Sequence, residues 1–277
     1  MNYRELLKDK KRIVVKIGSS SITYEETGHL NYNKLERLVR ILCDIKNSGK
    51  EVILVSSGAI AVGRQAVGID HKTDILAEKQ ACAAIGQGRL MMTYQKLFGE
   101  YNQLTAQVLL TKYTMADNES LYNARNTFKE LLRMGAIPVV NENDTVSTYE
   151  IEFGDNDKLS ALVASAIGAD LLILLSDIDG LYTADPHMDK SAKLIDVVDE
   201  ITPEIEALAG DSMSQVGTGG MSAKLHAAKI ATASGADMVI ANSADIDVVE
   251  RIVAGCNEGT LFIAHKDENF DIMDYLD

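Results

Sequence analysis

The chain has 277 residues, of which 41 are Asp or Glu and 27 are Lys or Arg, so its formal net charge is −14. Proteins that bind nucleic acid or anionic lipid along a broad surface depend on clustered Lys and Arg, and this charge argues against such partners. The length suits one large α/β domain. We therefore expect small-molecule partners, with positive charge gathered at a few lysines if the ligand is anionic.

Nothing in the sequence indicates export, a membrane span or a cross-linked framework. The three cysteines, Cys43, Cys82 and Cys256, form no CxxC pair, which favours a reducing compartment over disulfides or a zinc site. Residues 1–12 are charged and lack the apolar core of a secretory signal. The five histidines show no metal-binding spacing. We therefore expect a cytoplasmic protein.

Short apolar runs alternate with helical patterns along the chain. The runs predict strands at residues 13–17, 52–55, 104–110, 137–140, 171–175, 238–241 and 261–264. Apolar residues at helical spacing predict helices at 33–46, 78–98, 119–134, 158–167, 221–233 and 245–253. Alternating strands and helices are typical of parallel crossovers, and strands rich in Val, Ile and Leu are typical of a sheet covered on both faces. We therefore predict an α/β fold, a three-layer αβα sandwich with a mainly parallel central sheet.

The domain organisation follows from what the sequence lacks. No repeat, low-complexity stretch or linker divides the chain, so we expect a single domain over residues 1–277. Within it we expect two lobes, over about residues 1–168 and 169–277, that divide near Gly168.

A glycine-rich junction precedes the predicted helix at 221–233. Residues 217–224 read Gly-Thr-Gly-Gly-Met-Ser-Ala-Lys, which places Lys224 in the first helical turn. Unpaired N–H groups and the positive end of the helix dipole make a cation unfavourable there unless an anion binds beside it. The junction therefore predicts a phosphate cradle. The alternative is a flexible turn with Lys224 as a solvated surface residue.

Polar segments follow the predicted strands at their carboxyl ends, where ligands bind in open parallel sheets. These segments are residues 18–21, 56–59, 141–144, 154–157 and 176–180. Among them, Ser57 and Gly58 would offer a hydroxyl and a close backbone approach, or would simply form a tight turn. We expect donors and carboxylates to converge on one rim of the sheet.

Lys16 lies on a strand that should be buried on both faces. An unpaired buried ammonium group is strongly destabilising, so Lys16 needs a phosphate or an Asp as its counter-charge. The alternative is an edge strand from which Lys16 reaches water.

Three carboxylates, Asp144, Asp155 and Asp157, fall within a short span, but their spacing does not match the calcium loop of an EF-hand. One Asp placed between Lys16 and Lys224 would hold both ammonium groups, while another would accept hydrogen bonds from a substrate amine. Asp157 is also a candidate N-cap for the helix predicted from residue 158.

The usual nucleotide fingerprints are absent, since the chain contains no GxxxxGK[ST], no complete GxGxxG and no protein-kinase motif set. Six segments nevertheless occur in an order that resembles the glutamate 5-kinases, a branch of the amino acid kinase family. They are Val-Lys-Ile-Gly-Ser at 15–19, Ser-Gly-Ala-Ile-Ala at 57–61, Asn-Glu-Asn-Asp at 141–144, Gly-Asp-Asn-Asp at 154–157, Gly-Leu-Tyr-Thr-Ala-Asp-Pro at 180–186 and the junction at 217–224.

The resemblance covers nearly the whole chain and implies the amino acid kinase fold. It implies a cytoplasmic transferase that uses ATP and Mg²⁺ to phosphorylate the side-chain carboxylate of L-glutamate. The product would be L-glutamyl 5-phosphate, made in the first step of proline biosynthesis. A homo-oligomer, dimer or tetramer, and inhibition by proline are implied as well. The alternatives are a kinase for another acceptor, such as aspartate, carbamate or a nucleoside monophosphate, and a sensor without turnover.

The resemblance also implies residue roles. Lys16 and Lys224 would hold the phosphates, with Asp157 organising both lysines. Ser57, Asp144 and Asn156 would bind glutamate, in the N-terminal lobe. ATP would be bound mainly by the C-terminal lobe, through Lys16, Ser176, Asp177, Thr218, Gly219, Gly220, Met221, Ser222, Ala223 and Lys224. No direct protein ligand of Mg²⁺ is identified.

Two features depart from the family pattern. Ala223 stands where many relatives have threonine, which removes a hydroxyl but leaves the neighbouring lysine. The chain ends soon after its last predicted strand, so we expect no C-terminal PUA domain.

Overall fold

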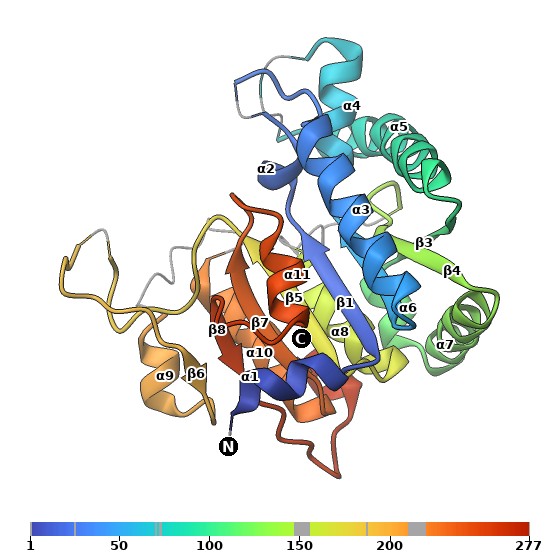
Figure 1. Cartoon of the computed structure of the whole chain (residues 1–277). Coiled ribbons are helices and arrows are strands. Elements are labelled where there is room, and N and C mark those ends of the chain that lie inside the picture. Colours follow the sequence, from blue (N-terminus) through green and yellow to red (C-terminus); the bar gives the residue numbers. More distant parts are fainter. Residues whose placement is uncertain are drawn as a thin grey trace.

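The structure is a computed structural model that describes residues 2–24, 26–69, 71, 74–146, 156–186, 188–209 and 220–276. Its centre is a sheet with the strand order β3-β4-β2-β1-β5-β7-β8-β6 (Figure 1). The strands are Arg12–Ile17 (β1), Glu51–Ser56 (β2), Leu104–Leu110 (β3), Ala136–Glu142 (β4), Leu171–Ser176 (β5), Val197–Val198 (β6), Asp237–Asn242 (β7) and Thr260–Phe262 (β8). Neighbouring strands pair in parallel, except β7 with β8.

Helices cover both faces of the sheet. They are Tyr3–Leu6 (α1), Ser19–Ile22 (α2), Tyr32–Asn47 (α3), Ala59–Val67 (α4), Leu76–Glu100 (α5), Lys112–Ala116 (α6), Asn118–Arg133 (α7), Asn156–Ile167 (α8), Pro203–Ala207 (α9), Met221–Ser234 (α10) and Val248–Val253 (α11), with 3₁₀ turns at Leu7–Asp9 (η1) and Ile272–Tyr275 (η2). Val14 of β1 packs in a cluster with α7, α8 and α10, while its neighbour Val15 packs with α3, α5 and α11. This confirms the predicted three-layer αβα sandwich.

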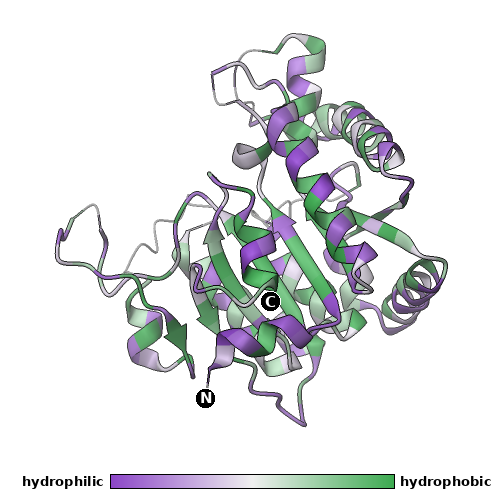
Figure 2. Ribbon diagram, in the orientation of Figure 1, coloured by the Kyte–Doolittle hydropathy of each residue, from purple (hydrophilic) through white to green (hydrophobic). Residues whose placement is uncertain are grey.

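The buried strands explain why the sequence pattern was informative. Figure 2 shows hydrophobic residues concentrated on the central strands, and all six residues of β5 are buried. A strand covered on both faces buries nearly all of its side chains, which favours the continuous apolar runs. No helix among the described residues combines the length and the hydrophobicity that a membrane span requires.

The predicted strands and helices are all present, with end points that shift by a few residues. The helix expected from residue 245 begins at Val248. Six elements, β6, α1, α2, α4, α6 and α9, were not predicted from the sequence pattern. All but α4 are no longer than five residues, so they show too little periodicity to detect.

The nine-residue helix α4 escaped prediction because glycines bracket and interrupt it. It begins after Gly58, whose φ of +102° favours glycine, and it contains Gly63. A Cβ atom added at Gly63 would lie 1.8 Å from the carbonyl oxygen of Cys82, and one added at Gly86 would lie 1.8 Å from that of Ala59. Helices α4 and α5 therefore touch backbone to backbone, which fixes α5 relative to the segment after β2.

Candidate active site

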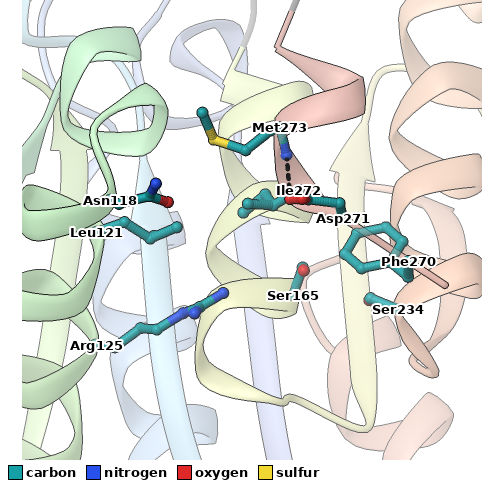
Figure 3. A pocket seen from close by; sticks show the side chains of 9 residues that line it. All are labelled: Asn118, Leu121, Arg125, Ser165, Ser234, Phe270, Asp271, Ile272 and Met273. Atoms are coloured by element: carbon teal, nitrogen blue, oxygen red, sulfur yellow. Dashed lines mark hydrogen bonds between the residues drawn. The ribbon is translucent and has the colours of Figure 1, made fainter. Parts of the chain in front are cut away.

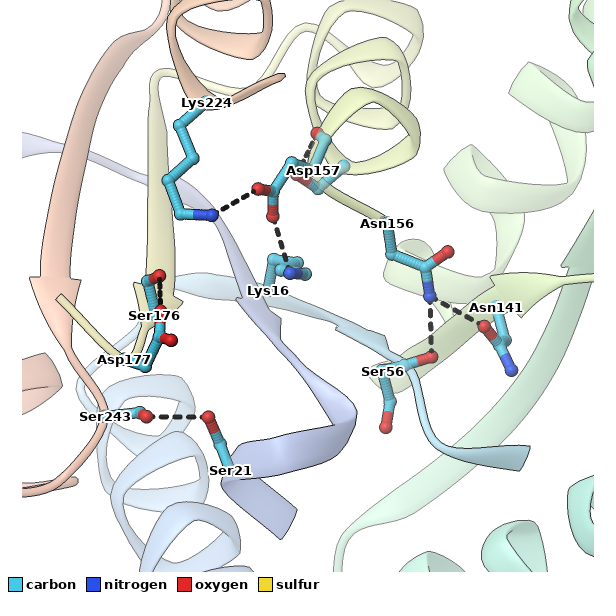
Figure 4. A network of polar contacts seen from close by, with 11 residues as sticks. Lys16, Ser21, Ser56, Asn141, Asn156, Asp157, Ser176, Asp177, Lys224 and Ser243 are labelled. Atoms are coloured by element: carbon cyan, nitrogen blue, oxygen red, sulfur yellow. Dashed lines mark hydrogen bonds and ion pairs between the residues drawn. The ribbon is translucent and has the colours of Figure 1, made fainter. Parts of the chain in front are cut away.

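Three charged side chains from three elements meet beyond the carboxyl end of β1 (Figure 4). Lys16 lies near the end of this central strand, Asp157 in the first turn of α8, and Lys224 in the first turn of α10. Lys16 Nζ lies 2.5 Å from Asp157 Oδ1, and Lys224 Nζ lies 3.1 Å from Asp157 Oδ2. The three residues are 2%, 0% and 4% exposed for Lys16, Asp157 and Lys224, so water does little to weaken these interactions.

Two ammonium groups share the one carboxylate of Asp157. Burial by itself would raise the pKa of Asp157, but the charges of Lys16 and Lys224 outweigh burial and hold that pKa below its usual range. Asp157 is therefore ionised at neutral pH. Two buried ammonium groups beside the first turns of two helices are suited to bind an anion such as phosphate.

Three alternatives from the sequence analysis are wrong. Lys16 does not lie on an edge strand, because β1 is paired on both sides, with β2 and β5. Lys224 is not a solvated surface residue, because it is buried. Asp157 is not the N-cap of its helix, because α8 already begins at Asn156 and the two carboxylate oxygens of Asp157 face the lysines.

The residues predicted to bind the acceptor lie on the side of β2 and β4. The Nδ2 group of Asn156 donates to the backbone carbonyl of Ser56 at 3.2 Å and to Oδ1 of Asn141 at 2.8 Å. Ser57 is half-buried and follows directly after β2, where its N–H donates to the carbonyl of Ile17 at 3.2 Å. The structure therefore brings Asn156 next to the β2 end that precedes Ser57.

Asp144 lies two residues beyond β4 and is half-buried. Burial raises the pKa of its carboxyl group to about 6. Within the described part of the chain, no hydrogen bond joins this carboxylate to Ser57 or Asn156, so the structure places Asp144 on the rim without linking it to them. Asp155, the third carboxylate of the span, lies outside the described residues.

A second group of polar side chains lies beyond β5 and β7 (Figure 4). Ser176 ends β5, and its hydroxyl donates to Oδ1 of Asp177 at 2.9 Å. The backbone carbonyl of Ser176 accepts from the N–H of Ser243 at 2.7 Å. The hydroxyl groups of Ser243 and Ser21 are 2.6 Å apart and both side chains are buried. This group forms the β5 side of the rim.

Only part of the predicted nucleotide segment can be described. Thr218 and Gly219 lie outside the described residues. Gly220 is the extended N-cap of α10 and is exposed, as is Ser222, while Met221 and Ala223 are half-buried. Lys224 is the residue of the described segment that turns inward to the charged cluster.

Sequence reasoning overlooked several polar residues of the rim. Asn242 ends β7 and Ser243 follows it, and Asn242 donates to Asp179 Oδ1 at 2.7 Å. Both residues come directly after the strand predicted at 238–241. Polar residues at the carboxyl ends of the other predicted strands were identified as site candidates, and the same criterion identifies these two. Gln87 and Tyr94 on α5 also reach the rim, but only tertiary packing shows this.

A separate hollow of about 350 Å³ lies away from the charged cluster (Figure 3). Its lining includes Ser165 near the end of α8 and Ser234 at the end of α10, together with Arg125 of α7. Asp157 is in the first turn of α8, so a rise of about 1.5 Å per residue puts Ser165 about 12 Å further along that helix. The hollow is therefore not part of the candidate site.

Known proteins of one family match this chain along most of its length. Residues 11–242 match the model of the amino acid kinase family. A glutamate 5-kinase from Carboxydothermus hydrogenoformans is 55% identical over 263 residues, which cover 95% of this chain and 70% of that protein. A glutamate 5-kinase from Clostridium perfringens is 50% identical over 96% of this chain and 100% of its own length.

Solved structures agree on the fold. A UMP kinase from Bacillus anthracis superposes with a TM-score of 0.61 at 17% identity and covers 92% of this chain and 96% of its own. A UMP kinase from Ureaplasma parvum gives a TM-score of 0.63 at 14% identity, over 92% and 99% of the two chains. At this identity the likeness concerns the fold alone, whereas the family model and the sequence relatives cover most of the chain. The chain therefore belongs to the amino acid kinase family.

Proposed function

We propose that this chain transfers the γ-phosphoryl group of ATP to the side-chain carboxylate of L-glutamate and so makes L-glutamyl 5-phosphate, the first step of proline biosynthesis. The observation that carries this proposal is the buried Lys16–Asp157–Lys224 cluster, found in a chain that is 55% identical to a glutamate 5-kinase over 95% of its length. The two lysines of the cluster would provide the positive charge that phosphoryl transfer requires. The acceptor, L-glutamate, is inferred from the glutamate 5-kinases that the chain resembles.

The acceptor needs no general base. A glutamate side chain has a pKa of about 4.3 and is already ionised at neutral pH, so no proton has to be removed before it attacks phosphorus. This fits a rim on which no histidine accompanies the two lysines among the described residues. The chemistry then depends on positioning and on charge neutralisation.

Lys16 and Lys224 would neutralise the oxygens of the transferring phosphoryl group. Asp157 touches both ammonium groups and would hold them at a fixed separation, without itself contacting phosphate. In a loose transition state negative charge spreads over the phosphoryl oxygens, so preset cations stabilise it more than the ground state.

Mg²⁺ fits this donor set as an ion carried mainly by the ATP phosphates. Among the described residues, no three His, Cys, Asp or Glu side chains gather closely enough to form a protein metal cage. Mg²⁺ usually binds through substrate phosphates and one or two carboxylates, and it would neutralise phosphate charge. Asp177 is an exposed carboxylate beyond β5, on the side of the sheet where the ATP phosphates and the ion would lie.

We assign the two halves of the sheet to the two substrates. Ser57, Asp144 and Asn156 lie on the side of β2 and β4 and would bind glutamate. Ser176, Asp177 and residues 218–224 would bind ATP on the side of β5. The phosphoryl group would pass between them beside β1, which separates β2 from β5 in the sheet.

ADP release with a panel of acceptors tests the proposal. The purified chain is incubated with ATP and Mg²⁺ and with L-glutamate, L-aspartate, carbamate or UMP. We expect release to depend on L-glutamate, and repeating the assay with proline tests the inhibition that the family resemblance implies. Turnover with UMP or L-aspartate but not with L-glutamate would replace the proposed acceptor. No acceptor-dependent release at all would favour a sensor.

A further inference from the structure

A chain of three buried amides connects helix α5 to the rim of the sheet. Gln87 Oε1 accepts from Asn141 Nδ2 at 2.9 Å, and Asn141 Oδ1 accepts from Asn156 Nδ2 at 2.8 Å. Gln87, Asn141 and Asn156 are 8%, 3% and 7% exposed, so these bonds replace contacts with water. Nothing in the proposed phosphoryl transfer uses Gln87, which lies on α5, away from β1 and α10.

Backbone groups with fixed roles decide which way these amides face. Asn141 Oδ1 also accepts from the backbone N–H of Glu142 at 2.9 Å, and an N–H can only donate. Asn156 Nδ2 also donates to the backbone carbonyl of Ser56 at 3.2 Å, and a carbonyl can only accept. The oxygen of Asn141 and the nitrogen of Asn156 are therefore assigned by chemistry.

This orientation determines what Asn156 offers to a ligand. Both hydrogens of its Nδ2 group are used, by Ser56 and by Asn141. Its Oδ1 points away from these two partners (Figure 4), and no donor among the described residues is bonded to it. Asn156 thus presents an acceptor, which suits a donor such as an ammonium group and repels a carboxylate.

Gln87 is held firmly enough to fix this arrangement. Its neighbour Gly86 packs directly on the backbone of Ala59, because a Cβ atom there would lie 1.8 Å from the Ala59 carbonyl oxygen. Ala59 begins α4 just after Ser57 and Gly58. The side chain of Gln87 therefore starts from a backbone position that is locked to the rim.

We propose that Gln87 is a positioning residue for acceptor recognition: it holds the amide of Asn141, which in turn keeps Oδ1 of Asn156 directed at the α-ammonium group of the acceptor. The inference rests on the proposed function and adds the residue that sets the preference for an amino acid over the matching dicarboxylate. If the Gln87 acceptor is lost, the buried Asn141 amide has an unsatisfied donor and no reason to keep its orientation.

Steady-state kinetics with L-glutamate and with glutarate, which lacks the amine, test the proposal. We expect Gln87→Leu to lower kcat/KM for L-glutamate by about tenfold or more, as the loss of one hydrogen bond to a charged group does. The effect should be in the KM for L-glutamate, with the KM for ATP unchanged. The kcat/KM for glutarate should change less than threefold. If glutarate turns over too slowly, its inhibition constant against L-glutamate serves instead.

Two further variants separate positioning from a loss of stability. Gln87→Glu keeps an acceptor oxygen for Asn141 and should restore most of the preference for L-glutamate. Tyr94→Phe removes another buried bond between α5 and the rim, the 2.8 Å contact of the Tyr94 hydroxyl with Ser56 Oγ, without touching the amide chain. Tyr94→Phe should lower the melting temperature about as much as Gln87→Leu does. It should leave the preference for L-glutamate over glutarate unchanged.

The outcomes distinguish this inference from the proposed function. A wild-type chain with no L-glutamate turnover would overturn the proposed function and, with it, the role of Gln87. An active wild type whose Gln87→Leu variant loses L-glutamate and glutarate equally would overturn the role of Gln87 alone. The same holds if Tyr94→Phe removes the preference to the same extent.

Discussion

The ammonium groups of Lys16 and Lys224 lie on the two oxygens of a single carboxylate, 2.5 Å and 3.1 Å from Oδ1 and Oδ2 of Asp157. The two lysines are far apart in the sequence, one in the central strand β1 and the other in the first turn of α10. Neither would be stable in a buried site without a counter-charge. Asp157 supplies that counter-charge to both lysines.

Replacing Asp157 should damage both stability and turnover. Asp157→Asn leaves two buried ammonium groups facing a neutral amide, and breaking a buried ion pair in this way costs about 3–5 kcal/mol. We expect that loss in the free energy of unfolding measured by urea titration, together with a fall in kcat. The matched control is Asp247→Asn, which breaks an exposed pair with Arg37 and should change the free energy of unfolding far less. Equal losses for both variants would contradict the account.

Removing Lys224 should affect turnover more than acceptor binding. Lys224→Ala deletes the cation that we propose acts on the transferring phosphoryl group, so we expect kcat to fall about 100-fold or more. The KM for L-glutamate should change little. Lys229→Ala on the same helix is the control, because Lys229 pairs with Glu206 at the surface. This variant should leave kcat and KM unchanged. A rise in the KM for L-glutamate without a fall in kcat would refute the assignment.

The pH dependence of acceptor use should report Asp144. Burial raises the pKa of this carboxyl group to about 6, and only its ionised form attracts an ammonium group. The kcat/KM for L-glutamate should therefore fall as pH drops through about 6. A profile of kcat/KM measured between pH 5 and 8 should show this fall on the acid side in the wild type but not in Asp144→Asn. The variant should also have a lower kcat/KM than the wild type at neutral pH. An unchanged fall in the variant would assign it to another group.

The same carboxyl group should make folding stability fall with rising pH. Because its pKa is higher in the folded chain than the ordinary value near 4, the folded state binds the proton more tightly. Its contribution to stability is present in acid and is lost as pH rises from about 4 to about 6. Urea titrations should show that the free energy of unfolding of the wild type falls, relative to that of Asp144→Asn, as pH rises from about 4 to about 6. A relative rise over this pH range would contradict the burial of Asp144.

Two glycines on α5 should respond oppositely to alanine. Gly86→Ala places a Cβ atom 1.8 Å from the Ala59 carbonyl oxygen, and we expect a loss of about 1–3 kcal/mol in the free energy of unfolding. Gly88→Ala has nothing within 4 Å of the new Cβ atom, so it should gain up to about 1 kcal/mol through helix propensity. If the two variants behaved alike, the direct packing of α4 on α5 would be wrong.

The sequence predicts the layers of this fold because buried parallel strands impose continuous apolar runs. It also flags Lys16, since a lysine within such a run requires a partner. It does not reveal the contact between Gln87 and Asn141, because these residues are 54 positions apart and meet only once α5 packs beside the sheet. Nor does it give the pKa of Asp144, which depends on how deeply the folded chain buries that side chain.

Trapping of the acyl phosphate tests the central claim most directly. Hydroxylamine is added to the purified chain with ATP, Mg²⁺ and L-glutamate, and the γ-glutamyl hydroxamate is measured. The account predicts hydroxamate that requires both ATP and L-glutamate and disappears in Lys224→Ala, while the Lys229→Ala control still forms it. ATP-dependent hydroxamate formation that survives in Lys224→Ala, or its absence in the wild type, would contradict transfer to the glutamate carboxylate at this site.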